Sequence, residues 1–175
     1  MPYMRIWRWE LAIQAIRYTE PNLEFLLNML AKIDQELYDN NQRHTEMAKN
    51  PPSAKLSEWF TVQESIGMSY LWVLGAYEAI RTLDQRFRDM NSAAAQRHQA
   101  STKLKHLYER LRVPLAKLEP SNRHRATDYG FPRPGIDEGH GIAWEVACDV
   151  VISRSQLSDE FLSFLESLQN GTLAN

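Results

Sequence analysis

A proline- and glycine-rich segment in the last third of the chain holds two residue types suited to acid–base chemistry on a phosphate group. It contains Arg133 and His140, with six residues between them. Histidine exchanges protons near neutral pH, and arginine binds phosphate oxygens through paired hydrogen bonds. The two residues are therefore candidate catalytic groups for cleavage of a phosphodiester. The alternative is an exposed loop whose charges form ordinary caps and ion pairs.

The segment from Arg133 to His140 reads Arg-Pro-Gly-Ile-Asp-Glu-Gly-His. This spacing resembles the motif of the HEPN-type helical ribonucleases and toxins, in which four to six residues separate an arginine from a histidine. The resemblance implies an all-α, usually dimeric protein that cleaves RNA without a metal ion, using Arg133 and His140. It covers eight residues of 175. Pro134 and the neighbouring glycines predict a loop here, whereas the family carries its motif at a helix.

The segment 97–125 is strongly basic. It has eight lysines and arginines against two acidic residues. Clustered cationic side chains attract phosphate groups, so Arg123, His124 and Arg125 are candidate binding residues for RNA or another phosphate-bearing ligand. The alternative is a solvated helix face whose charge is balanced by acidic helices elsewhere.

The loop 119–141, which contains these candidates, has three prolines and four glycines. That composition disfavours regular structure. Tyr129 and Phe131 argue against disorder, because burial of each ring stabilises the fold by about 1.5–3 kcal/mol. We therefore expect an ordered loop that packs both rings near the basic helix.

Motifs for metal ions and cofactors are absent from the sequence. No Glu-x-x-His, His-x-x-x-His or Cys-x-x-Cys spacing occurs, and these are the spacings of di-metal bundles and zinc sites. We therefore predict no metal site and no cofactor. Cys148, the single cysteine, lies in an apolar run, which predicts packing in the core.

The least charged long run, 66–80, predicts the central helix of the fold. Its apolar residues recur at steps of three and four on two faces, which is typical of a helix buried among others. Gly67 and Gly75 lie two turns apart on the second face. Each costs about 1 kcal/mol relative to alanine, and close approach of another helix would offset that cost. Only 65–77 lacks charges, too short to span a bilayer, which takes about 20 residues.

Glu78 is a carboxylate on that second, mostly apolar face. An unpaired buried charge is expensive, so Glu78 needs a partner, with Arg81 nearby in the chain or Arg110 or Arg112 farther away. One interpretation is a structural ion pair. The other is a small-ligand pocket in which Glu78 is a binding or catalytic group.

The remaining pattern predicts an all-α, single-domain bundle of five or six helices over 1–175, with one long Pro/Gly-rich loop. Helical periodicity covers 5–18, 21–38, 57–90, 93–111 and 158–170. The segment 142–152 is ambiguous, because its apolar residues alternate as in a strand while Glu145, Asp149 and Ser153 lie four apart as on a helix. We favour a helix, since the chain offers no strong pairing partner. A short strand near 142–152 is the alternative.

Composition sets broad limits on location and partners. The net charge is −2 with 24% charged residues, which gives no global indication of nucleic-acid or membrane binding. A single cysteine excludes an intramolecular disulfide and fits a reducing compartment. The N-terminal residues have no apolar core of signal-peptide length. We therefore expect a soluble, cytoplasmic protein without membrane contact.

Three functional hypotheses follow. The first is an interaction protein that binds a protein partner or forms a homo-oligomer. Trp7 lies off the apolar series of the first helix, which indicates either a second buried face or a subunit contact. The second is a metal-independent HEPN-like ribonuclease, and the third is a small-ligand pocket protein around Glu78.

Overall fold

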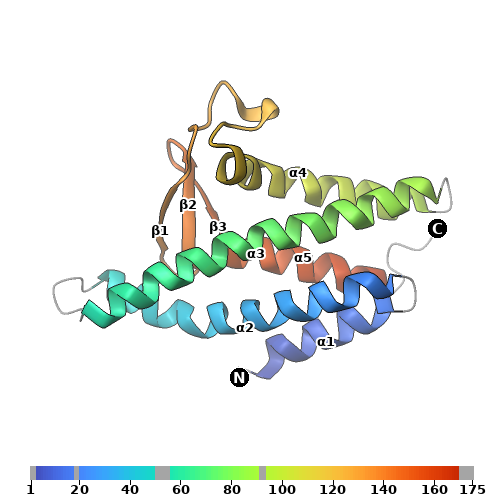
Figure 1. The fold of residues 1–175 in the computed structure, drawn as a ribbon, viewed down its shortest axis with the longest axis horizontal. Coiled ribbons are helices and arrows are strands. Elements are labelled where there is room, and N and C mark those ends of the chain that lie inside the picture. Colours follow the sequence, from blue (N-terminus) through green and yellow to red (C-terminus); the bar gives the residue numbers. More distant parts are fainter. Residues whose placement is uncertain (1–2, 18–19, 50–55, 91–93, 170–175) are drawn as a thin grey trace.

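The computed structural model describes residues 3–17, 20–49, 56–90 and 94–169. This part of the chain forms five α-helices and a three-stranded antiparallel sheet (Figure 1). The elements are α1 (Tyr3–Arg17), α2 (Pro21–Lys49), α3 (Leu56–Asp89), α4 (Ala95–Lys117), a 3-10 helix (Asn122–His124), β1 (Arg133–Asp137), β2 (Gly141–Ala147), β3 (Val150–Ser153) and α5 (Arg154–Gln169). The mostly helical fold class predicted from the sequence is confirmed.

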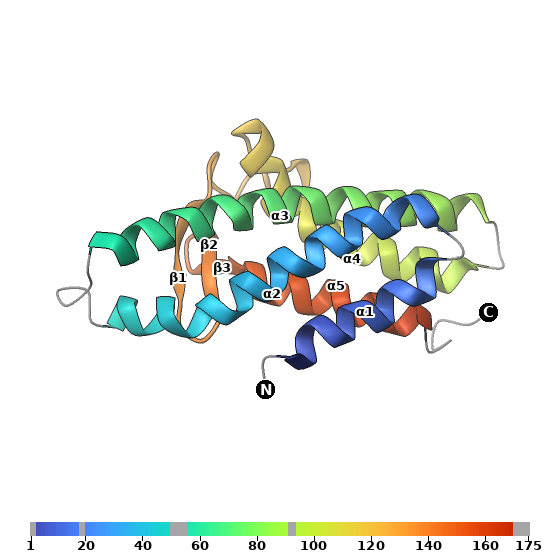
Figure 2. The ribbon, with the colours of Figure 1, turned by 60° about the horizontal axis from the view of Figure 1, so that its bottom comes forward.

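The long helices α2 and α3 run side by side in opposite directions and form the frame of the molecule (Figures 1 and 2). α4 packs along α3, and α1 packs against both α2 and α5. The sheet contacts α2 and α5 through β2. The helices therefore surround one shared hydrophobic core, and each buries apolar side chains in it.

Two helices extend beyond the ends that we predicted. α2 does not end at 39–41 but continues to Lys49, and side-chain pairs within the helix satisfy its polar groups, such as Gln35 to Asp39 at 2.8 Å. α4 does not end at 111 but continues through Pro114 to Lys117. The predicted break at 91–92 lies outside the described residues.

The segment 142–152 forms most of β2 and β3, so our preference for a helix was wrong and the alternative strand is confirmed. Its pairing partner, β1, lies inside the predicted loop. Asp149, which we placed on a polar helix face, has a φ of 57° in the turn between β2 and β3. Cys148 lies in the same turn and is exposed, so the predicted packing of its thiol in the core is also wrong.

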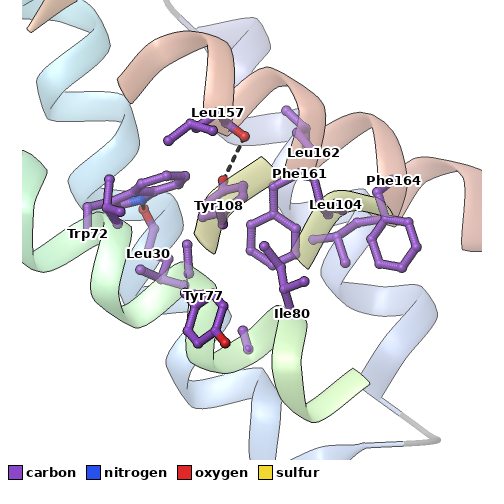
Figure 3. Close-up of a cluster of buried hydrophobic side chains, with 14 of the residues drawn as sticks. Leu30, Trp72, Tyr77, Ile80, Leu104, Tyr108, Leu157, Phe161, Leu162 and Phe164 are labelled. Carbon is purple, nitrogen blue, oxygen red and sulfur yellow. Dashed lines mark hydrogen bonds between the residues drawn. The ribbon is translucent and has the colours of Figure 1, made fainter. Parts of the chain in front are cut away.

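Aromatic residues from three helices fill the centre of the core (Figure 3). The ring centroid of Tyr108 lies 6.4 Å from those of both Trp72 and Phe161. The Tyr108 hydroxyl donates to the Leu157 carbonyl at 2.6 Å, and the Trp72 indole donates to the Leu30 carbonyl at 2.9 Å. Burial raises the pKa of the Tyr108 hydroxyl well above its ordinary value. These hydrogen bonds satisfy polar groups that burial would otherwise leave unpaired.

Candidate functional site

The structure places the two candidate catalytic residues at opposite ends of one hairpin. Arg133 begins β1, opposite Glu145 of β2, and His140 lies in the turn after Asp137. The rise along β1 from Arg133 to Asp137 is about 13 Å at the spacing of a strand. Two groups that act on one phosphate must both lie within hydrogen-bonding reach of it. The hairpin does not bring these two side chains together.

Each of these side chains has its own carboxylate neighbour. Arg133 Nη1 lies 3.6 Å from Glu145 Oε2, and the guanidinium lies over the Tyr129 ring at 4.6 Å. His140 Nδ1 lies 2.9 Å from Asp137 Oδ2. Such contacts are typical of an ordered loop whose charges form ion pairs.

In the basic segment, at least four of the eight lysines and arginines have carboxylate partners. The pairs are Lys105–Asp84, Arg110–Asp128, Arg112–Glu78 and Arg125–Glu119. Arg123 lies instead with Nη2 at 3.0 Å from His106 Nε2, and His124 is half-buried beside it in the chain. Part of the positive charge is thus neutralised, as expected for a solvated helix face balanced by acidic residues elsewhere.

The loop 119–141 is held against the basic helix mainly by an ion pair and less by burial of its aromatic rings. Arg110 of α4 donates two hydrogen bonds of 2.9 Å to Asp128. Burial opposes ionisation of Asp128, but the bonds from Arg110 outweigh it and hold its pKa below the ordinary value. The Tyr129 N–H donates to the Val146 carbonyl at 2.8 Å, and the Tyr129 side chain is half-buried. Phe131 is 50% exposed, so the predicted burial of that ring is wrong.

Glu78 is a surface carboxylate held by two arginines. Its oxygens lie 2.8 Å from Arg81 Nε and 3.5 Å from Arg112 Nη2, and its side chain is 44% exposed. Two of the partners named from the sequence, Arg81 and Arg112, are therefore in contact with it, whereas Arg110 pairs with Asp128. A groove of about 530 Å³ lies elsewhere, between α2 and the turn after β1, and is lined by Tyr38, Asp39, Asn41, Gln42, Thr45, Glu46, Lys49 and Gly139.

A buried charge cluster that we did not predict joins α1, α2 and α5. Asp34 is fully buried in α2 and accepts hydrogen bonds from Arg5 Nε at 2.6 Å and from Trp9 Nε1 at 2.7 Å. Arg154, which is also buried, donates to the other carboxylate oxygen. Arg5 continues the network to the Ser158 hydroxyl at 2.8 Å. Three helices that are distant in sequence are thus tied to one carboxylate.

Two arginines share this carboxylate, and they oppose the effect of burial on it. Burial raises the pKa of Asp34, but the charge of Arg154 and the hydrogen bond from Arg5 outweigh burial, so the pKa lies below its ordinary value. Asp159, at 2.6 Å from Arg5, supplies a second carboxylate at the edge of the cluster. The two arginines are thus paired with carboxylates of their own chain, although the buried Nη2 of Arg154 has no hydrogen-bond partner among the described residues.

The outer side of α2 and α3 exposes large apolar side chains. Leu71 of α3 is 64% exposed, and Met29 and Phe25 of α2 are 47% and 76% exposed. We call this surface the apolar face, formed by Phe25, Leu26, Met29 and Ile33 of α2 with Gly67, Leu71, Leu74 and Gly75 of α3. No charged residue occurs in 25–31 or in 65–77, so the centre of the apolar face is uncharged.

The two halves of the apolar face meet at Gly75. A Cβ added there would lie 3.2 Å from Leu30 Cδ2 and 3.9 Å from Leu26 Cδ1, which confirms the predicted close helix contact. Leu71 lies one turn before Gly75, and Gly67 one turn before Leu71, on the same side of α3. No described atom lies within 4 Å of a Cβ added at Gly67. The close contact predicted there is wrong, and the second apolar face of α3 is exposed at Gly67 and Leu71.

Trp7 lies on a different exposed surface. Its side chain is 57% exposed on α1, whereas Trp9, two residues on, is fully buried. The alternative that Trp7 forms a second buried face of the first helix is therefore wrong. Its position leaves a subunit contact through α1 as a rival to one through the apolar face.

No family model, curated protein or solved structure matches this chain. Among the helices of the described ranges, none has both the length and the hydrophobicity needed to cross a bilayer. The described residues also contain no group of three or more histidine, cysteine, aspartate or glutamate side chains placed to hold a metal ion. Of the features above, the apolar face most requires a functional explanation, because large exposed apolar side chains gathered on neighbouring helices are typical of interaction sites.

Proposed function

We propose that this protein self-associates through the apolar face, with a second copy of the chain as partner. The observation that carries the proposal is the 64% exposure of Leu71 on a surface whose centre is uncharged. Interface centres are depleted of charged residues and enriched in methionine and aromatic side chains. The apolar face has that composition, with Met29 and Phe25 on α2 and Leu71 on α3.

Burial of these side chains supplies the favourable free energy of association. A fully buried leucine, methionine or phenylalanine contributes about 1.5–3 kcal/mol. Roughly half or more of that free energy is still available for association. The reason is that Leu71, Met29 and Phe25 are 64%, 47% and 76% exposed. Core packing already fixes the two helices that carry them, which reduces the ordering that association requires.

The charges that border the face favour a second copy in antiparallel orientation. On α3, Glu64 precedes the uncharged run, and Glu78 follows it. Glu78 lies against Arg81 and Arg112, so two arginines outweigh one carboxylate at that end. A two-fold axis across α3 directs Glu64 of each chain toward the half of the partner helix that carries Arg81. A parallel arrangement sets like charges opposite each other, which is unfavourable. The apolar face is thus complementary to itself, as a two-fold interface requires.

Light scattering after size-exclusion chromatography, at tens of micromolar protein, tests the proposal. The wild type should have twice the 20.4 kDa mass of the chain, and Leu71→Glu should be monomeric because it places a charge at the centre of the interface. Leu118→Glu is the matched control, since Leu118 is 69% exposed at the end of α4, and it should remain dimeric.

Trp7→Ala distinguishes the two surfaces. Under the proposal this variant remains dimeric, because α1 lies outside the interface. A dimer lost in Trp7→Ala but retained in Leu71→Glu would move the contact to α1 and contradict the proposal. A monomeric wild type would contradict self-association itself.

A further inference from the structure

The two glycines of α3 have different explanations. At Gly75 the neighbouring helix is the reason, because Leu30 lies 3.2 Å from an added Cβ. At Gly67 no contact within the described chain excludes a side chain, and the residue is exposed. A glycine inside a helix is less stable than alanine there. The chain therefore carries at Gly67 a destabilising residue that its own packing does not require.

We propose that Gly67 is a recess that receives Leu71 of a second copy, an inference that rests on the proposed self-association. Leu71 lies one helical turn from Gly67 and is 64% exposed. A two-fold axis across α3 at the level of Ser69, midway between them, sets each Leu71 over Gly67 of the other chain. Absence of a side chain lets the opposing backbone approach closely, and side chains of one helix then fill the gaps of the other.

The same axis keeps the two copies of Glu64 apart. Glu64 lies five residues from Ser69, so the two copies of Glu64 are separated by about 15 Å along the helix direction. That separation exceeds the screening length of roughly 8–10 Å in ordinary buffers. The recess therefore brings the apolar residues together without forcing these carboxylates against each other.

Gly67→Leu distinguishes a recess from a glycine that is merely exposed, because the two cases predict opposite changes in the affinity of the dimer. On a flat apolar face, an added leucine enlarges the apolar surface and strengthens the dimer or leaves it unchanged. In a recess, the new side chain occupies the place of Leu71 and weakens the dimer. We expect at least a tenfold increase in the dimer dissociation constant, measured by sedimentation equilibrium.

Gly67→Ala in the Leu71→Glu background reports the effect on the helix alone. We expect a melting temperature about 2–4 °C higher than that of Leu71→Glu. In the otherwise wild-type chain, the same substitution should weaken the dimer several-fold. A change that raises the stability of the monomer and weakens the dimer is the signature of a glycine kept for association.

The outcomes separate the recess from self-association. A wild-type dimer that is strengthened or unchanged by Gly67→Leu overturns the recess and leaves self-association standing. A wild type that is monomeric at the same concentrations overturns the proposed function and the recess with it. Circular dichroism of Gly67→Leu checks that it folds, and Gly67→Ala supplies the same comparison with a smaller side chain.

Discussion

The two sides of α2 reverse the usual distribution of polar and apolar residues. On the inner side, Asp34 is fully buried and is held by Arg5, Trp9 and Arg154. On the outer side, Met29 is nearly half exposed in an uncharged surface. The buried carboxylate is held by groups of its own chain, whereas Phe25, Met29 and Leu71 on the outer side are left largely uncovered by the described residues. We therefore expect substitutions on the inner side to change folding and substitutions on the outer side to change association.

Asp34→Ala should have the largest effect. It leaves Arg5 and Arg154 without the carboxylate they share, and loss of one member of a buried ion pair costs about 3–5 kcal/mol. Urea denaturation measures the change in unfolding free energy. Asp39→Ala removes an exposed carboxylate from the same helix and should change that free energy by less than about 0.5 kcal/mol. Equal effects of the two substitutions would show that the cluster is not a special feature of the inner side.

Gly75→Leu should destabilise the fold by about 1–3 kcal/mol, the usual cost of an overpacked site. The reason is that Leu30 and Leu26 already occupy the space beside Gly75. Thermal unfolding at a concentration where the chain is monomeric measures the effect, with Gly67→Leu as the control that should unfold no earlier than wild type. An unchanged melting temperature for Gly75→Leu would mean that α2 and α3 do not approach closely there.

Acid should remove the contribution of Asp34 to stability. Its pKa in the folded chain lies below the ordinary value of 3.8. The ionised carboxylate therefore stabilises the fold fully above about pH 4, and this stabilisation is lost as the pH falls through the folded-state pKa.

The difference in unfolding free energy between wild type and Asp34→Asn isolates this effect, because the other carboxylates titrate in both proteins. We expect the difference to be constant near neutral pH and to shrink below about pH 4. A difference that does not change between pH 7 and pH 2.5 would show that Asp34 is not stabilised in its charged form.

Glu78→Gln should have the smallest effect. The Glu78 side chain is 44% exposed, and exposed ion pairs contribute at most about 1 kcal/mol. Urea denaturation in low and high salt measures the contribution, which should decrease with salt. A loss above about 2 kcal/mol would instead indicate a desolvated pair.

The sequence predicted most of the helices because each buries one side against the core. It did not predict the sheet, since β1 contains Pro134 and Gly135, which locally disfavour a strand. Pairing with β2 overrides that preference, and this pairing is a tertiary contact that no local pattern shows. The same contact turned a segment of equivocal periodicity, 142–152, into two strands.

The buried cluster and the apolar face show two different limits of sequence reasoning. Asp34 was readable as unusual, because it lies four residues after Leu30 and three before Leu37 in an apolar series. Its partners could not be found in that way, since they lie 29 and 120 residues away along the chain. The exposure of Leu71 was not predictable at all. An apolar helix face has the same pattern whether the helix that covers it belongs to the same chain or to another.

The concentration dependence of thermal stability tests self-association through the apolar face most directly. Association stabilises the folded state by mass action, so the melting temperature of a dimer rises with protein concentration. We predict that the wild type melts a few degrees higher at 100 μM than at 1 μM, whereas Leu71→Glu melts at the same temperature at both concentrations. A wild-type melting temperature that does not depend on concentration, or an equal dependence in Leu71→Glu, would contradict the central claim.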